Sequence, residues 1–135
     1  SFAAIGLLAY LAIPMLRPAP PEVPVPVLAA QLKGQSGPLE LLAIVEAGGT
    51  EVGLRRIAGT APEGRVLELW AILPEQAPLS LGVLPQTEVM RIALPAVLAG
   101  KLGQVTLAIT DEPVGGAPDG SPTGEIRAVG ALEEI

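Results

Sequence analysis

The sequence predicts an all-β protein, an antiparallel β-sandwich of about seven to eight strands with one short helix, preceded by an apolar helical stub. Short apolar runs alternate with turn signals along most of the chain, and 16 Gly and 15 Pro punctuate a largely aliphatic composition. A chain of 135 residues, half of them apolar, has enough material for a single hydrophobic core. We therefore expect one folded domain over residues 27–135.

The stretch from Val66 to Pro85 is predicted to be a β-hairpin around which the other strands are arranged. Leu67 and Leu69 fall on one face of its first strand, and Glu68 and Trp70 fall on the other. Both faces are largely apolar, so this strand is expected to be covered on both sides. Prolines bracket the turn, where they end a strand without breaking a hydrogen-bonded ladder.

The other elements follow from the same alternation. Gln104–Thr110 alternates most regularly and is predicted to have one solvent-exposed face. Leu94–Gly100 has a proline near its start and a glycine at its end, which favours a short helix. The remaining strands are expected over residues 27–33, 39–46, 52–57, 66–73, 79–84, 88–93 and 125–132.

Residues 1–16 contain no charged side chain and are apolar all round. A helix of that length reaches about 24 Å, less than the roughly 30 Å hydrocarbon core of a bilayer. We therefore interpret this segment as the C-terminal part of a transmembrane helix. A secretory signal segment is an alternative, although no A-x-A-like cleavage site follows, and a buried core segment is another.

Residues 17–26 are predicted to form a stiff, polyproline-like stalk, because each proline favours extended geometry in its predecessor. An ordinary linker with no membrane at its far end has the same composition. If the stalk emerges from a membrane, its protease-accessible residues are expected to be Arg17, Pro18, Ala19, Pro20, Pro21 and Glu22.

Composition excludes several function classes. The net charge is −6 and the eight basic residues do not cluster, so direct nucleic-acid binding is not expected. The chain has no Cys and no His, which removes the usual catalytic triads and the usual zinc and iron ligands. We expect no cofactor, no metal and no catalytic residue.

Three weaker site hypotheses remain. Asp111, Glu112 and Asp119 offer oxygen ligands for calcium, but their spacing does not match an EF-hand and a long surface loop explains them as well. Paired carboxylates for glycoside hydrolysis would need aromatic platforms, whereas Trp70 is the only aromatic residue of the predicted domain. We interpret Trp70 as a core or interface anchor, and Glu40, Glu68 and Glu88 as outward strand positions.

A serine–lysine dyad is the one nucleophilic pairing that the composition permits, from Ser80 or Ser121 with Lys33 or Lys101. No S-x-x-K or nucleophile-elbow pattern supports it. Solvated side chains at strand ends explain these residues better, as they do the basic pair Arg55–Arg56.

The order of motifs from Val27 to Leu132 resembles the C-terminal domain of the anti-sigma-K factor family. An ELW strand is followed by a P-x-S-LG-x-L hairpin, a strand that ends in Glu-Pro, and a loop with Pro-Thr-Gly that leads to a last strand ending in GAL. The residues that carry the resemblance are Glu68, Leu69, Trp70, Leu81, Gly82, Glu112, Pro113, Pro122, Thr123 and Gly124.

The resemblance implies a single-pass protein of the bacterial inner membrane with this domain on the extracytoplasmic side. A cytoplasmic domain, absent from this chain, would sequester an extracytoplasmic-function sigma factor, and envelope proteases would release it by successive cleavage. The domain would then act as a sensor or shield that protects the stalk. The alternative is a non-signalling envelope module that self-associates through exposed sheet edges, the Trp70 face or residues 1–16.

Overall fold

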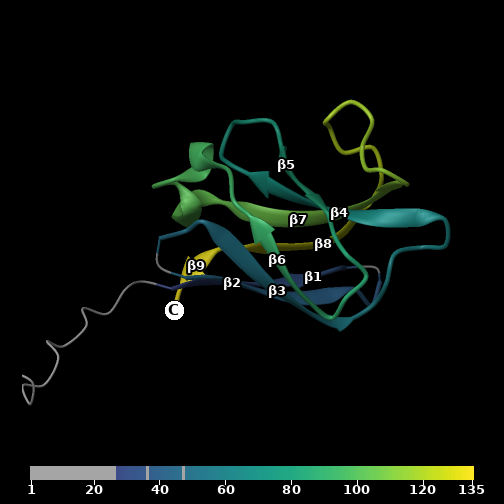
Figure 1. Ribbon diagram of the computed structural model, residues 1–135, viewed down its shortest axis with the longest axis horizontal. Helices are drawn as coiled ribbons and strands as arrows, with labels where there is room; N and C mark the ends of the chain where they lie inside the picture. The colour runs from purple at the N-terminus through teal and green to yellow at the C-terminus, as the bar shows by residue number, and fades with distance from the viewer. Residues whose placement is uncertain (1–26, 36, 47) are drawn as a thin grey trace, which may run out of the picture.

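The computed structural model describes residues 27–35, 37–46 and 48–135, and its strands wrap around one core (Figure 1). The all-β prediction is confirmed. Within these residues there are two short 3₁₀ helices, η2 (Ala96–Leu98) and η3 (Leu102–Gln104). The strands are β1 (Leu28–Lys33), β2 (Glu40–Val45), β3 (Glu51–Ala58), β4 (Arg65–Ile72), β5 (Leu79–Val83), β6 (Val89–Ala93), β7 (Thr106–Pro113), β8 (Ile126–Ala131) and β9 (Glu133–Glu134).

The strands form one antiparallel sheet in the order β5-β4-β7-β8-β1-β2-β3-β6, and β9 pairs with β1 beside β8. β5 and β6, at the two ends of this order, also contact each other, so the sheet is nearly closed. The β4–β7 half lies across the core from β2 and β3 (Figure 1). β1, the first strand of the domain, is therefore an interior strand with neighbours on both sides.

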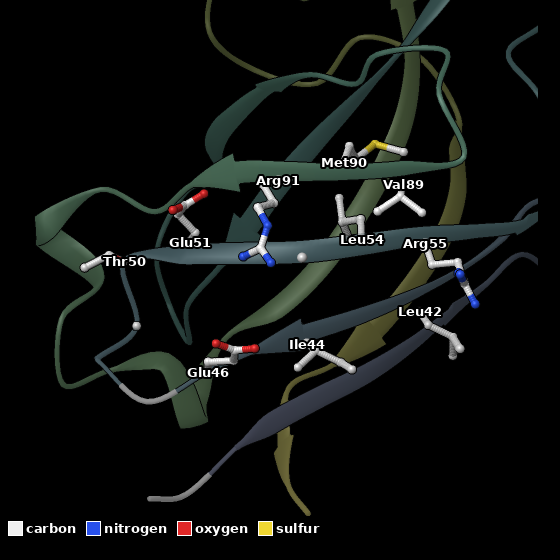
Figure 2. A pocket seen from close by; sticks show the side chains of 12 residues that line it. Leu42, Ile44, Glu46, Thr50, Glu51, Leu54, Arg55, Val89, Met90 and Arg91 are labelled. Carbon is white, nitrogen blue, oxygen red and sulfur yellow. The ribbon is translucent and has the colours of Figure 1, made fainter.

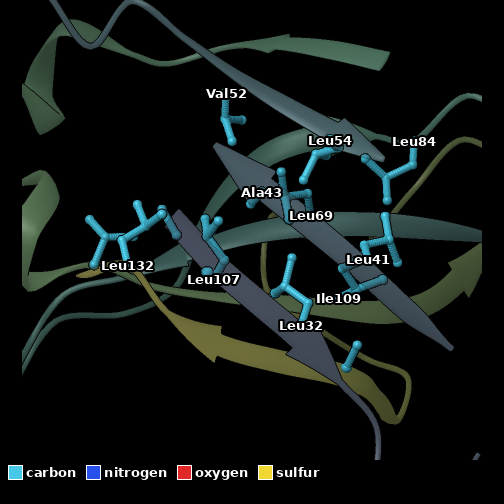
Figure 3. Packing of buried hydrophobic residues seen from close by; sticks show 14 of the residues in the cluster. Leu32, Leu41, Ala43, Val52, Leu54, Leu69, Leu84, Leu107, Ile109 and Leu132 are labelled. Carbon is cyan, nitrogen blue, oxygen red and sulfur yellow. The ribbon is translucent and has the colours of Figure 1, made fainter. Parts of the chain in front are cut away.

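The core is filled by the inward residues of every long strand, as strand alternation requires. Leu69 of β4 and Leu107 of β7 point toward Leu41 of β2 and Leu54 of β3, and all four side chains are 0–1% exposed (Figure 3). The aliphatic face predicted for the first strand of the hairpin is this core face. Leu98 of η2 is also buried, so the 3₁₀ segment closes one end of the core.

The predicted β4–β5 hairpin is confirmed, with one irregularity. Leu69 pairs with Gly82 and Trp70 pairs with Ser80, so Leu81 has no partner in the ladder and forms a bulge. Gly82 has φ 118°, a backbone conformation that favours glycine. The bulge changes the strand direction while Leu81 stays packed against the core.

One expectation about exposure was wrong. The outer face of β7 was expected to be exposed, but Ala108 and Thr110 are only 2% and 1% exposed. Glu68 was interpreted as an outward strand position, and it does lie on the outer face of β4, but that face is covered and Glu68 is only 4% exposed. The physical reason is the long connection between β7 and β8, which folds back over this face and whose Ala117 N–H reaches Glu68.

Two further expectations concern helices. The short helix predicted over Leu94–Gly100 is a single 3₁₀ turn at Ala96–Leu98, and a second turn follows at Leu102–Gln104. The apolar stub and the proline-rich stalk, residues 1–16 and 17–26, lie outside the described residues. Within the described part of the chain, no helix is long and apolar enough to cross a membrane.

Candidate functional site

The outer face of β4 and β7 forms a second buried region, separate from the core. Trp70 is 0% exposed, yet Trp70 and Ala108 are the two buried hydrophobic residues of the described chain that do not belong to the core cluster. The indole is therefore enclosed by the chain itself. Trp70 is thus an anchor buried within the domain, and its own side chain presents no exposed surface for self-association.

A hydrogen-bonded series leads from Trp70 to Glu112 across two strands. The indole Nε1–H donates to Thr110 Oγ1 over 2.8 Å, and the Thr110 hydroxyl donates to Glu112 Oε2 over 2.5 Å. Thr110 is directly opposite Glu68 in the β4–β7 register, so the series runs along the outer surface of the paired strands. The single polar atom of the indole, which would be costly to bury alone, is thus satisfied.

Glu112 binds the far end of the loop that covers it. Its Oε1 accepts the Thr123 backbone N–H at 3.0 Å and the Thr123 hydroxyl at 2.5 Å. Its Oε2 also accepts the Gly124 N–H at 3.1 Å. A Cβ atom on Gly124 would collide with the Asp111 carbonyl, so only glycine lets the loop approach this closely.

These donors determine the charge state of Glu112. Burial by itself raises the pKa of the carboxyl, but hydrogen bonds from the Thr110 and Thr123 hydroxyls and from the Gly124 and Thr123 amides outweigh it. The pKa of Glu112 is lowered to about 2. The carboxylate is therefore ionised throughout the physiological range, stabilised by hydrogen-bond donors rather than by a cation.

A second carboxylate, Glu68, binds the middle of the same loop. Its Oε1 accepts the Ala117 N–H and its Oε2 accepts the Ser80 hydroxyl, each at 2.7 Å. Ser80 in turn accepts the Gly82 N–H at the bulge. Gly116 has φ 93°, and a Cβ atom there would contact the Glu68 carboxylate. The loop thus requires glycine where it passes over Glu68.

Asp111 points to the opposite face of β7 from Glu112 and forms an ion-pair cluster with two arginines. Arg65 Nε donates to its Oδ1 at 2.8 Å, and Arg127 Nε donates to its Oδ2 at 2.6 Å. Burial raises the pKa of Asp111, but the hydrogen bonds and charges of Arg127 and Arg65 outweigh it and lower that pKa below its usual range. The cluster joins β4, β7 and β8 at one end of the sheet.

Sequence reasoning did not find this cluster. The available signal was the position of Asp111 in the alternation of β7, on the same face as the core residues Leu107 and Ile109. A carboxylate buried on that face needs a cationic or hydrogen-bonding partner.

The structure brings together five of the ten residues that carried the family resemblance, namely Glu68, Trp70, Glu112, Thr123 and Gly124. We call this assembly the loop clamp: Glu68, Trp70, Ser80, Thr110 and Glu112 on the sheet, with Ala117, Thr123 and Gly124 on the loop. Leu69 lies in the core instead, and Gly82 forms the adjoining bulge. Pro113 ends β7, and Pro122 is half-buried beside Thr123.

The catalytic and calcium hypotheses find no support in this geometry. Ser80 donates its hydroxyl to Glu68, while Lys33 lies 3.8 Å from Glu40. Asp111 and Glu112 bind arginines and loop donors on opposite faces of β7, and Asp119 is exposed. Among the described residues, no group of three or more acidic side chains is placed to hold a metal ion.

A groove of about 460 Å³ crosses the outer face of β2, β3 and β6 (Figure 2). Gly53 lines it between its register partners Ile44 of β2 and Arg91 of β6, and a Cβ atom there would meet only ordinary van der Waals contact. The exposed apolar side chains Leu42, Ile44 and Val89 lie along it. Its charged lining comprises Arg55, Arg91, Glu46 and Glu51.

Comparison with known proteins gives one family. The family model described as anti-sigma-K factor rskA, C-terminal, matches residues 1–126, whereas no curated protein and no solved structure matches significantly. The matched region contains the whole loop clamp and ends at the first residue of β8. Anti-sigma factors are regulatory proteins rather than enzymes, and their partners are sigma factors. The match spans most of the chain, which therefore belongs to the anti-sigma-K factor C-terminal family.

Proposed function

We propose that this domain is the extracytoplasmic shield of a single-pass membrane anti-sigma factor of the bacterial inner membrane. In this proposal residues 1–16 belong to the membrane helix and residues 17–26 form the stalk. Release of the sigma factor follows cleavage of the stalk by an envelope protease. The family match and the apolar, then proline-rich, N-terminal sequence support this layout.

The observation that carries the proposal is the place of β1 in the sheet. β1 begins two residues after Pro26, and all six of its residues pair with β2. On its other side it pairs with β8 and β9. The last residues of the stalk are thus joined directly to an interior strand, and a protease that needs extended backbone gains access to this junction only when the strand pairing around β1 opens.

The loop clamp supplies the stability that keeps the shield closed. It fixes a long loop, with four glycines and three prolines between Asp111 and Gly124, through buried carboxylates that cannot be left unpaired without cost. We infer that substitutions in the clamp open the domain, expose the stalk and raise sigma-dependent transcription.

The test uses the full anti-sigma factor in cells with a transcriptional reporter for its sigma factor. Thr110→Val removes the central hydroxyl of the clamp, and Thr106→Val, on the same strand and face but half-buried, is the matched control. The proposal expects higher reporter output for Thr110→Val only. Equal output from both variants, with Thr110→Val shown to be destabilised, would contradict it.

The groove on β2, β3 and β6 favours a second candidate function, a binding or assembly module. Leu42, Ile44 and Val89 are 41%, 47% and 60% exposed and line the same groove, and clustered exposed apolar side chains of this kind are typical of an interaction surface. Sedimentation of the domain without residues 1–26 tests it, with Ile44→Lys as the variant. Association that disappears in Ile44→Lys would support this alternative. A domain that stays monomeric at every concentration tested would exclude self-assembly as its function.

A further inference from the structure

β9 covers the edge of β1 next to the stalk. Glu134 pairs with Leu28 and Glu133 pairs with Ala29 in antiparallel register. The ladder is extended by the Ile135 N–H, which donates to the Val27 carbonyl at 3.0 Å. Farther along β1, the pairing with β8 is at Lys33 and Val129. Because alternate residues of a strand bond to opposite neighbours, Val27 and Ala29 depend on residues 133–135 for backbone hydrogen bonds, whereas the backbone groups of Leu28 face β2.

β9 is attached much more weakly than the strand it covers. It has two residues, both exposed, and Ile135 is 85% exposed, so it adds no side chain to the core. The core anchor is Leu132, which is 2% exposed and whose N–H donates to Val105 rather than to β1. Residues 133–135 can therefore leave β1 while Leu132 stays in place.

An uncovered β1 edge would present a short row of free backbone donors and acceptors. Such an edge binds an extended peptide by strand addition, in which main-chain hydrogen bonds supply the affinity. The covering strand carries Glu133 and Glu134, whereas Val27, Leu28 and Ala29 are uncharged, so the edge itself sets no charge requirement on a replacement strand.

We propose that residues 27–29 form a strand-addition site that β9 occupies in the closed domain and that an extended polypeptide segment of a protease occupies when β9 leaves. The identity of the partner as a protease rests on the proposed function, but the site itself does not. The family match ends at residue 126, so β9 is a feature of this chain that the match does not account for. Release of β9 would open the stalk junction without unfolding the sheet.

The test compares the chain with two variants by hydrogen exchange resolved to residues 27–30. One variant ends at Leu132, and the other carries Glu133→Pro, because Glu133 is the β9 residue whose backbone faces Ala29 and proline cannot donate to the ladder. Glu133→Gln is the matched control, since it removes the charge and keeps the backbone. We expect exchange at Ala29 to rise about tenfold in the first two variants only, while Leu28, whose amide faces β2, stays protected and unfolding followed by Trp70 fluorescence is nearly unchanged.

A peptide with the sequence of residues 130–135, GALEEI, should restore protection when added at millimolar concentration to the variant ending at Leu132. Unchanged exchange in that variant would overturn the proposal, as would unfolding of the whole domain, which would make β9 part of the cooperative core. If exchange rises but sigma-dependent transcription in cells does not, the strand-addition site stands and the protease role fails.

Discussion

Glu112 and Thr123 are eleven residues apart in the chain and share three hydrogen bonds, two from the Thr123 amide and one from its hydroxyl. One carboxylate at the end of β7 thereby holds the return of the loop that leads to β8. The same carboxylate receives the Thr110 hydroxyl from within the sheet. Loop closure and burial of Trp70 are therefore parts of one polar network.

The first prediction concerns the centre of this network. Thr110→Val keeps the shape of the side chain but leaves the Trp70 indole N–H without its acceptor and Glu112 without a donor. We expect the free energy of unfolding to fall by about 2 to 4 kcal/mol. Urea unfolding followed by the fluorescence of the single tryptophan measures it. A loss no larger than that of Thr106→Val would contradict the role assigned to Thr110.

The second prediction is a pH dependence. The pKa of Glu112 is about 2 in the folded domain, below the ordinary 4.5 expected on unfolding. As the pH falls, the unfolded state therefore takes up this proton at a higher pH than the folded state does. The stabilisation that the ionised Glu112 gives the folded domain is fully present above about pH 5 and is lost as the pH falls toward 2, about 3 kcal/mol in all. The lowered pKa of Asp111 adds a loss of the same sign.

Denaturant midpoints between pH 7 and pH 2 measure this effect. Glu112→Gln should be less stable at pH 7 and lose less on acidification, while Glu88→Gln, at an exposed position, should follow the parent chain. Parallel curves for Glu112→Gln and the parent chain would show that this carboxylate is not the titrating group.

The third prediction concerns the approach of the loop to β7. Gly124→Ala places a methyl group against the Asp111 carbonyl and must displace one backbone or the other. We expect a loss of about 3 kcal/mol or failure to fold, in line with overpacked sites. Gly103→Ala, where nothing lies within 4 Å of the new atom, should have little effect. Thermal unfolding separates the two, and equal melting temperatures would be inconsistent with the loop position.

The fourth prediction concerns the ion-pair cluster. Asp111→Asn leaves Arg65 and Arg127 without their shared charge, and both guanidiniums are about one-third exposed, so solvent compensates in part. We expect a loss of about 1 to 3 kcal/mol at pH 7. Asp119→Asn, on the exposed part of the loop, is the control. A loss confined to Asp119→Asn would refute the cluster.

Much of the fold could be predicted because strand alternation and turn residues are local signals. The β4–β5 hairpin and the core face of β7 follow from the spacing of leucines, prolines and glycines alone. Alternation also placed Glu68 on the outer face of one strand and Thr110 on the outer face of another, and it indicated that the first of these strands is covered on both sides. It could not show that the Thr110 face is covered or what covers either strand, because the cover is a loop whose contacts lie up to 49 residues away.

The polar site could be predicted only as a set of motif residues, without their contacts. Nothing local indicates that Glu112 would accept from Thr123 or that Trp70 would reach Thr110, because these bonds depend on strand register. β9 was not predicted either, since two residues show no periodicity. Its pairing follows from where Leu132 enters the core.

The most direct test of the shield is the position and rate of the first cut in the full, membrane-embedded protein. Mass spectrometry of the released domain gives its N-terminal residue, for the parent, Thr110→Val and Thr106→Val proteins. We expect an N-terminus within residues 17–29 and faster release for Thr110→Val alone. A first cut inside the sheet, or equal rates for all three proteins, would contradict the claim that the folded domain controls access to the stalk.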